Sequence, residues 1–196
     1  MSENKHALPR AAELGGERFT LRRMGDGDRE AVLAFARALP EHDLVFLPRD
    51  ITEPKVVDAW LRGIGRGDIV SVLACRGEAV VGCSTLVRDP HSWSAHVGEL
   101  RLVLLPDLRG KGLGQLLAQE AFVLGLEAGC EKMTAQMTVD QTGAIAIFEG
   151  LGFAPEAMLR DHVRDRSGQV SDVVVLSHDV ARFRARLETY GVTEAV

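Results

Sequence analysis

The stretch LPDLRGKGLGQLLAQEA combines three glycines and two cations with an apolar helical pattern that follows them. Gly110, Gly112 and Gly114 allow backbone N–H groups to approach a ligand closely, because glycine lacks a Cβ and tolerates positive φ values. The unpaired N–H groups in the first turn of the following helix carry partial positive charge. Arg109 and Lys111 add two charged donors. Together these features predict an anion-binding loop, and in particular one for phosphate groups.

The spacing of the glycines distinguishes between kinds of phosphate-binding loop. A Walker loop has the pattern G-x-x-x-x-G-K-[ST], but here the lysine precedes Gly112 and no serine or threonine follows it. The dinucleotide fingerprint G-x-G-x-x-G follows the first strand of a βαβ unit, whereas Gly110, Gly112 and Gly114 are spaced two and two. Both of these sites are therefore excluded. The pattern that remains is R-x-x-G-x-G, which Arg109, Gly112 and Gly114 form after a strand ending in LVLLP.

The elements that position this loop follow from hydrophobic periodicity. Alternation over 94–106 predicts a strand that leads into the loop, with Glu99, Arg101 and Val103 on one face. Apolar residues at helical spacing predict a helix over 113–128. The other expected elements are strands at 18–24, 69–76, 79–88 and 132–139, helices at 29–40, 52–67, 142–152 and 181–190, and two strands within 153–180 around the turn RSGQ.

Capping and stop signals bound the first two helices. Asp26 or Asp28 is expected to cap the first, which Pro40 ends, and Thr52 to cap the second, with Pro54 in its first turn. The order of the elements predicts a mixed α/β (α+β) fold. Its central sheet is expected to be mostly antiparallel, with about six to seven strands flanked by helices.

Length and composition predict one folded domain. The chain has 196 residues, 46% of them hydrophobic, which is enough to bury a core without metal or disulfide support. Residues 1–17 are expected to be a flexible lead-in, and 18–196 the single domain. The net charge of −5 argues against nucleic-acid binding, and no run approaches the about 20 apolar residues of a membrane span. Three cysteines without CxxC spacing indicate reduced thiols in a cytoplasmic protein, and no metal site.

At the glycine loop the chain resembles the GNAT superfamily of acetyl-CoA-dependent N-acetyltransferases. The resemblance rests on the R-x-x-G-x-G pattern and on a second stretch, QTGAIAIFEGLGF (Gln141–Phe153), which is similar to a later helix of the family. It extends over residues 18–180, since the order of strands and helices also agrees. It implies the GNAT fold and an enzyme that moves an acetyl group from acetyl-CoA to a primary amine of a small molecule or peptide, by direct attack in a ternary complex.

The resemblance also assigns residues to the coenzyme. In the family, the glycine loop binds the pyrophosphate through backbone amides, and a bulged strand before it pairs with the pantetheine arm, because a bulge leaves backbone groups free. The later helix completes the site. The residues implied to bind acetyl-CoA are Leu102, Val103, Leu104, Arg109, Gly110, Lys111, Gly112, Leu113, Gly114, Gln141, Ala144 and Phe148.

Two residues depart from the family pattern. Many relatives have asparagine at the position of Gln141 and tyrosine at that of Phe148, and this tyrosine commonly protonates the departing thiolate. Phe148 has no hydroxyl group, and the chain contains a single tyrosine, Tyr190. Because a thiol has a pKa of about 8.5, we expect the thiolate to leave without a protein acid.

The amine substrate must lose a proton, because an alkylammonium ion with a pKa of about 10 is not nucleophilic. Glu99 resembles in position the glutamate that many family members use as a base, directly or through water. The alternative is a structural carboxylate paired with Arg101 or with an arginine on a neighbouring strand. His91, His96 and His162 are weaker candidates for the base.

Glu41, His42 and Asp43 lie in the connection between the first two helices, which in the family forms one wall of the acceptor pocket. Their negative charge favours a cationic amine.

An amino acid, a polyamine, an aminoglycoside, a peptide N-terminus and a lysine all remain open as acceptors, and the resemblance implies a possible homodimer. The alternatives to this function are transfer of a longer acyl group and a catalytically weak acyl-CoA-binding regulatory module.

Overall fold

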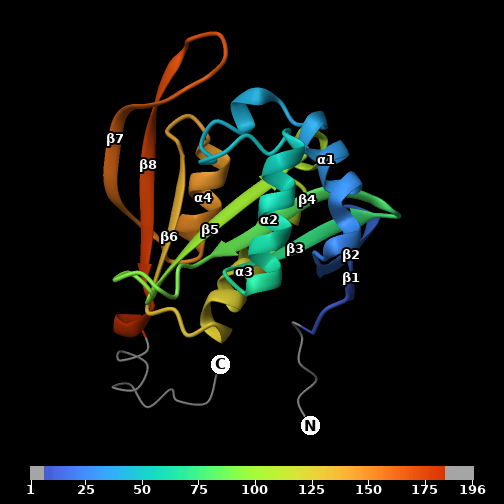
Figure 1. Cartoon of the computed structure of the whole chain (residues 1–196), viewed down its shortest axis with the longest axis horizontal. Helices are drawn as coiled ribbons and strands as arrows, with labels where there is room; N and C mark the ends of the chain where they lie inside the picture. Colours follow the sequence, from blue (N-terminus) through green and yellow to red (C-terminus); the bar gives the residue numbers. More distant parts are fainter. Residues whose placement is uncertain (1–6, 184–196) are drawn as a thin grey trace.

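The computed structural model describes residues 7–183, which form an eight-stranded sheet with helices on both faces (Figure 1). The strand order is β1-β2-β3-β4-β5-β6-β8-β7. The strands are β1 (Arg10–Leu14), β2 (Glu17–Arg23), β3 (Ile69–Arg76), β4 (Ala79–Val87), β5 (Val97–Leu104), β6 (Lys132–Thr138), β7 (Ala154–Arg164) and β8 (Val170–Asp179). The helices are α1 (Arg29–Ala38), α2 (Pro54–Arg66), α3 (Leu113–Glu127) and α4 (Thr142–Gly150), with short 3-10 turns η1 (Asp26–Asp28), η2 (Glu41–Asp43) and η3 (Pro106–Leu108).

One pair of strands differs from the rest of the sheet. All neighbours are antiparallel except β5 and β6, which are parallel because α3 crosses over between them. Their pairing ends at Leu100 opposite Ala135, although β5 continues to Leu104. The two strands therefore diverge at their carboxyl ends, and the last residues of β5 have no strand partner on the β6 side.

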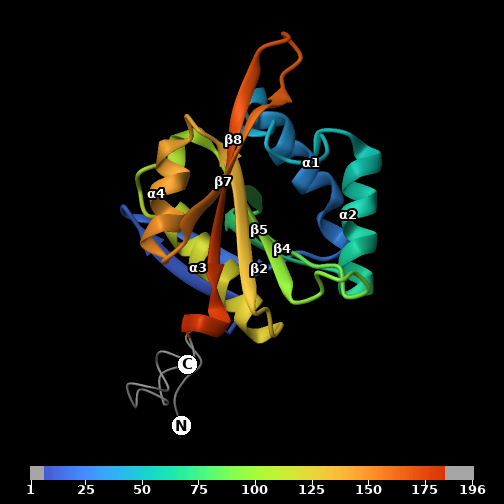
Figure 2. The same cartoon turned by 90° about the vertical axis from the view of Figure 1, so that its left-hand side faces the viewer.

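Helices cover the two faces of the sheet in pairs: α3 and α4 lie on one face, and α1 and α2 on the other (Figure 2). On α3, Leu113, Leu117 and Ala121 recur at helical spacing and are buried against the first face. Val32 and Val57 bring α1 and α2 onto the second face. The predicted fold class is confirmed, with eight strands where about six to seven were expected.

The additional strand comes from the supposed lead-in. Arg10–Leu14 form β1, antiparallel to β2, so the prediction of a flexible segment over 1–17 is wrong for these residues. The Nη2 atom of Arg10 also donates to Oε1 of Glu120 on α3 at 2.5 Å. The segment RAAEL lacks β-branched residues, and so its local pattern did not indicate a strand that tertiary contacts stabilise. Residues 1–6 lie outside the described part of the chain.

The helix caps were predicted in part. Pro54 is the first residue of α2, as expected, but the N-cap is Glu53 and not Thr52, whose hydroxyl donates to Asp50 at 2.6 Å instead. Asp28 occupies the N-cap of α1 without a side-chain bond to the helix. Its carboxylate is bound by an arginine on β2 instead.

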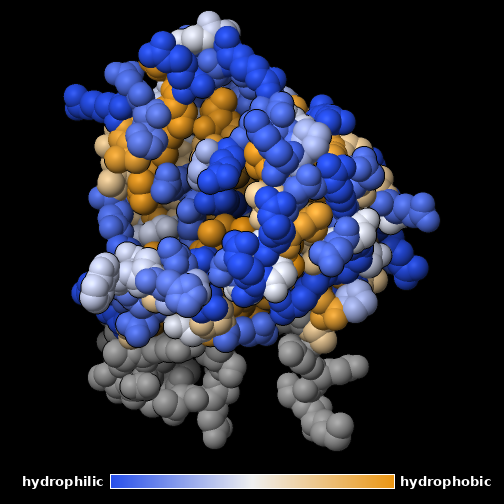
Figure 3. Space-filling view, viewed as in Figure 1, coloured by the Kyte–Doolittle hydropathy of each residue, from blue (hydrophilic) through white to orange (hydrophobic). Residues whose placement is uncertain are grey.

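Strands β7 and β8 form a long hairpin that extends past the rest of the sheet (Figure 1). Apolar surface gathers over this part of the sheet (Figure 3), where Met158 is 61% exposed. The helix predicted at 181–190 lies for the most part outside the described residues. Among the described residues, no helix is both long and apolar enough to cross a membrane.

Candidate active site

A cavity of about 620 Å³, here called the central cavity, lies where β5 and β6 diverge. The glycine loop, the N-terminus of α3 and the N-terminal half of α4 enclose it. Most of the residues expected to bind the coenzyme meet here, together with one residue of η2. These lining residues are Leu102, Val103, Leu104, Arg109, Gly110, Gly112, Gly114, Gln141, Ala144 and Asp43.

The glycine loop has the geometry of an anion-binding site. Gly110 and Gly112 have φ values of 72° and 88°, in the left-handed region that glycine adopts without strain. Gly112 is the N-cap of α3, and no side chain caps this helix. The N–H groups of its first turn are therefore free of a capping side chain, and they carry the positive end of the helix dipole.

The end of β5 forms a second wall of the central cavity. Residues 101–104 pair with β4 on one side only, because the pairing with β6 stops at Leu100. Backbone groups on the open side can therefore accept and donate hydrogen bonds as a sheet edge does. An extended ligand with amide groups matches this edge.

Three residues of the predicted set lie away from the central cavity. Lys111 donates to Glu17 at 2.9 Å, and this bond holds the pKa of Glu17 below its ordinary value. Leu113 is fully buried in the core. Phe148 is also buried, with its ring centroid 5.2 Å from that of Phe153. The side chains of Leu113 and Phe148 thus pack in the core, and that of Lys111 forms a surface ion pair.

An ion pair links the glycine loop to the connection between α1 and α2. The guanidinium of Arg109 donates to the carboxylate of Asp43. Asp43 is only 11% exposed at its side chain, whereas Arg109 is 50% exposed. A phosphate group in the central cavity would therefore compete with Asp43 for the same guanidinium.

A second link joins η2 to the segment after β6. His42 Nε2 lies 2.6 Å from Oδ2 of Asp140, which lines the central cavity. Partial burial raises the pKa of Asp140, but hydrogen bonds from its neighbours, His42 among them, outweigh this effect and hold the pKa below its ordinary value. Gln141 is the N-cap of α4, and its side-chain oxygen accepts from the backbone N–H of Thr138 at 3.2 Å. This segment is thus ordered by local bonds.

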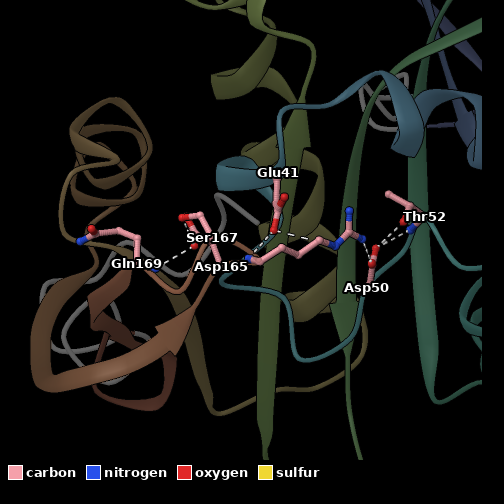
Figure 4. A network of polar contacts seen from close by, with 7 residues as sticks. Glu41, Asp50, Thr52, Asp165, Ser167 and Gln169 are labelled. Carbon is pink, nitrogen blue, oxygen red and sulfur yellow. Dashed lines mark hydrogen bonds and ion pairs between the residues drawn. The ribbon is translucent and has the colours of Figure 1, made fainter.

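Glu41 does not line the central cavity. Its carboxylate accepts from the backbone N–H of Arg166 at 2.7 Å, at the tip of the β7–β8 hairpin (Figure 4). The side chain of Arg166 continues to Asp50. The Nε atom of Arg166 also lies 3.9 Å from Oε1 of Glu41, and Asp43 is paired with Arg109, so both carboxylates of η2 have an arginine partner.

Glu99 lies on β5, on the face of the sheet that carries α1 and α2. It does not line the central cavity. Its two carboxylate oxygens accept from Nε and Nη2 of Arg101 at 2.7 and 3.0 Å. The contact with Arg101 is the one expected of a structural carboxylate. The role of Glu99 as a base stays a prediction.

The central cavity also contains residues that the sequence analysis did not single out. Thr142 and Gly143 fall within the stretch that resembles the later family helix, and Asp140 immediately precedes it. Their closeness in sequence to Gln141 and Ala144 could therefore have indicated them. Nothing in the sequence indicated that Phe46 and Gln115 line a site, because an aromatic residue in a loop and a polar residue on a helix are common in any protein. The set is Phe46, Gln115, Asp140, Thr142, Gly143 and Ile147.

The fold is shared with solved acetyltransferases. A ribosomal-protein-alanine N-acetyltransferase from Brucella melitensis superposes with a TM-score of 0.68 at 21% identity, over 81% of this chain and 98% of that chain. YncA from Salmonella typhimurium, a putative acetyltransferase solved with its cofactor acetyl-CoA, gives a TM-score of 0.70 at 17% identity, over 83% and 94% of the two chains. The fold is thus that of the acetyltransferases.

Sequence similarity defines the family. Residues 36–153 match the sequence model of the acetyltransferase (GNAT) family, so the chain belongs to this family of acyltransferase enzymes. A stretch of 52 residues is 36% identical to N-alpha-acetyltransferase MAK3 from Arabidopsis thaliana, over 26% of this chain and 27% of that protein. Members of the family transfer the acetyl group of acetyl-CoA to amines.

Proposed function

We propose that this N-acetyltransferase binds acetyl-CoA in the central cavity and transfers the acetyl group directly to a primary amine of a small molecule or peptide. One observation carries the proposal. The strands β5 and β6 separate beside a glycine loop and a helix N-terminus that no side chain caps. Such a site offers an anion-binding end and an adjacent sheet edge, the two features that a pyrophosphate joined to an amide-containing arm requires.

The described residues fit this ligand. Gly110, Gly112 and the first turn of α3 would bind the pyrophosphate through N–H groups, with Arg109 as a charged donor released from Asp43. The open edge of residues 102–104 would pair with the amide groups of the pantetheine arm. A Cβ at Gly114 would come 3.1 Å from Ile147 on α4, so glycine here lets the two helices approach closely at the floor of the cavity.

Acetyl-CoA supplies an activated acetyl group, and the protein positions the amine against it. The reaction forms a bond between the amine nitrogen and the acetyl carbon and breaks the carbon–sulfur bond, so that CoA leaves as a thiolate. A backbone N–H at the end of β5 would polarise the thioester carbonyl. Glu99 would take the proton of the amine through water, because its carboxylate lies outside the central cavity and is already bound by Arg101.

The proposal is tested by calorimetric titration with acetyl-CoA. We expect one-to-one binding by the wild-type protein and a loss of about tenfold or more in affinity for Arg109→Ala, since a charge-assisted hydrogen bond is removed. Gly112→Asp places a carboxylate in the anion site and should abolish binding. Arg18→Ala, at an exposed arginine of β2, is the matched control and should bind like wild type. Absence of binding by the wild-type protein would overturn the proposal.

A release assay separates this function from an acyl-CoA-binding regulatory module. The absence of a tyrosine at position 148 is the observation that favours such a module. An enzyme releases CoA in proportion to added amine, whereas a regulatory module binds acetyl-CoA and releases none with any amine. Propionyl-CoA in the same assay tests transfer of a longer acyl group.

A further inference from the structure

A second cavity of about 320 Å³, here called the lateral cavity, lies on the α1–α2 face of the sheet. It is bounded by α2, by the loop that precedes α2, and by strands β3, β4 and β5. Val103 lines both this cavity and the central cavity, so the two meet at the end of β5. A molecule in the lateral cavity therefore lies next to the site proposed for the thioester.

The lateral cavity has a fixed apolar wall. Leu47, Ile51, Val56 and Trp60 line it from the loop and from α2. The indole N–H of Trp60 donates to the hydroxyl of Ser71 at 2.9 Å, and this hydroxyl lies 3.0 Å from that of Thr85. These bonds run from α2 through β3 to β4 and hold the indole ring against the sheet.

The floor of the lateral cavity contains a buried thiol. Cys83 lines it beside Thr85. Complete burial raises the pKa of Cys83 to about 12, so the group stays protonated and serves as an apolar surface. Together with the wall, this floor favours an aliphatic or aromatic side chain over a polar chain.

The charged side chains that line the lateral cavity are all arginines. Arg49, Arg66 and Arg101 line it, and among residues 7–183 no carboxylate does. Arg66 is paired with Asp68 at 2.7 Å and Arg101 with Glu99. Arg49 has no ion pair or hydrogen bond within the described part of the chain, and it is exposed at the rim. Its guanidinium is therefore available to an anionic group of a ligand.

We propose that the acceptor of this acetyltransferase is a small amine that carries a carboxylate and an apolar side chain, in the simplest case an apolar α-amino acid, bound in the lateral cavity. Arg49 binds the carboxylate, Trp60 and its apolar neighbours bind the side chain, and the amine points along Val103 toward the central cavity. The inference rests on the proposed function, since it names the substrate class of the same reaction.

Charge and size both support this class of acceptor. A polyamine or an aminoglycoside carries several positive charges, which the unpaired guanidinium of Arg49 repels and no lining carboxylate among residues 7–183 attracts. The volume of about 320 Å³ is at the lower end of the range for small-molecule sites. A short amino carboxylate fills such a space, whereas a folded peptide terminus would need an open groove.

The first experiment measures binding without catalysis. The chain has two tryptophans, and Trp93 is fully exposed, so Trp93→Phe leaves Trp60 as the single fluorophore in the lateral cavity. Leucine, leucinamide and spermidine are each titrated into this variant with saturating CoA. We expect a saturable change in Trp60 fluorescence with leucine and a weaker one with leucinamide, which lacks the carboxylate. A response to spermidine alone, or to none of the three ligands, overturns the inference.

The second experiment measures turnover. Arg49→Gln should raise the KM for leucine about tenfold or more and leave that for leucinamide nearly unchanged, because one charge-assisted contact is lost. Arg62→Gln, at an exposed arginine of α2 that does not line the cavity, is the matched control and should change neither KM. An unchanged KM for leucine in Arg49→Gln overturns the inference. If acetyl-CoA binds but only spermidine is acetylated, the inference fails and the proposed function stands; if acetyl-CoA does not bind, both fail.

Discussion

At the scale of single residues, the central question is how Glu99 acts while it is paired with Arg101. The pair sits on the face of β5 that leads to Val103 and to both cavities. A carboxylate that shares a guanidinium keeps free lone pairs, so it can still accept a hydrogen bond from water. Because Glu99 lines neither cavity, we propose that it acts as a base through water.

Glu99→Gln should lower kcat at neutral pH by about 100-fold, because a positioned base is lost, and leave acetyl-CoA affinity unchanged. The measurement is a profile of kcat between about pH 6 and 9 beside a calorimetric titration. Glu131→Gln, at an exposed glutamate in the turn before β6, should behave like wild type. Equal rates for Glu99→Gln and wild type over this pH range would contradict the role of Glu99 as a base.

At the scale of elements, the β7–β8 hairpin holds the connection between α1 and α2. Asp165 accepts from Ser167 and from the backbone of Gln169 at 2.7 and 2.9 Å, which orders the turn at the tip (Figure 4). The hydrogen bond from Ser167 is the main reason that the pKa of Asp165 lies below its ordinary value. The turn presents Arg166 to Glu41 and Asp50. The loop that bounds the lateral cavity is thus fastened to a distant hairpin.

Arg166→Ala should loosen this loop with little effect on global stability, since exposed ion pairs contribute only about 0–1 kcal/mol each. We expect faster amide hydrogen exchange in residues 41–53, by up to about fivefold, and an almost unchanged midpoint of thermal unfolding. Arg160→Ala, at an exposed arginine of β7, is the control. Unchanged exchange in 41–53 would show that the side chain of Arg166 does not restrain the loop.

At the scale of the whole molecule, one buried histidine links folding stability to pH. His178 on β8 is 7% exposed among Phe122, Phe153 and Phe183, with ring centroids at 5.1, 5.5 and 5.6 Å. Burial lowers the pKa of His178 below its ordinary value, and the charge of Asp179 only partly offsets this effect. The unfolded chain therefore binds the proton more tightly than the folded one does, so stability falls as pH falls below about 6.5.

His178→Asn should flatten this dependence. Between about pH 7 and 5 the free energy of unfolding of the wild type should decrease by up to about 1.4 kcal/mol per pH unit from this group, and the variant should lack that contribution. Urea unfolding at both pH values measures the difference. His96→Asn, at an exposed histidine, should keep the slope of the wild type. A variant with the wild-type slope would show that other groups cause the acid sensitivity.

The sequence by itself determined the features that depend on local geometry. The glycines at 110, 112 and 114 predict the anion-binding loop, and Gly110 and Gly112 do have the positive φ that glycine adopts without strain, whereas Gly114 lies within α3. Hydrophobic patterning predicted the central strands and α1 to α4, because these elements bury apolar residues in the core. Most of the residues predicted to bind the coenzyme line the central cavity, since they lie on the loop and the strand next to it, and their role in binding stays a prediction.

The tertiary structure decided everything that depends on partners distant in sequence. Arg10–Leu14 became a strand through β2 and Glu120, contacts that no local pattern reports. Asp43 is paired with the guanidinium of Arg109 and Glu41 with that of Arg166, so the charge of η2 depends on arginines from other elements, and its role in binding a cationic amine stays a prediction. The physical reason is that the burial and the charge environment of a residue depend on its neighbours in space. These neighbours come from distant parts of the sequence and meet only when the chain folds.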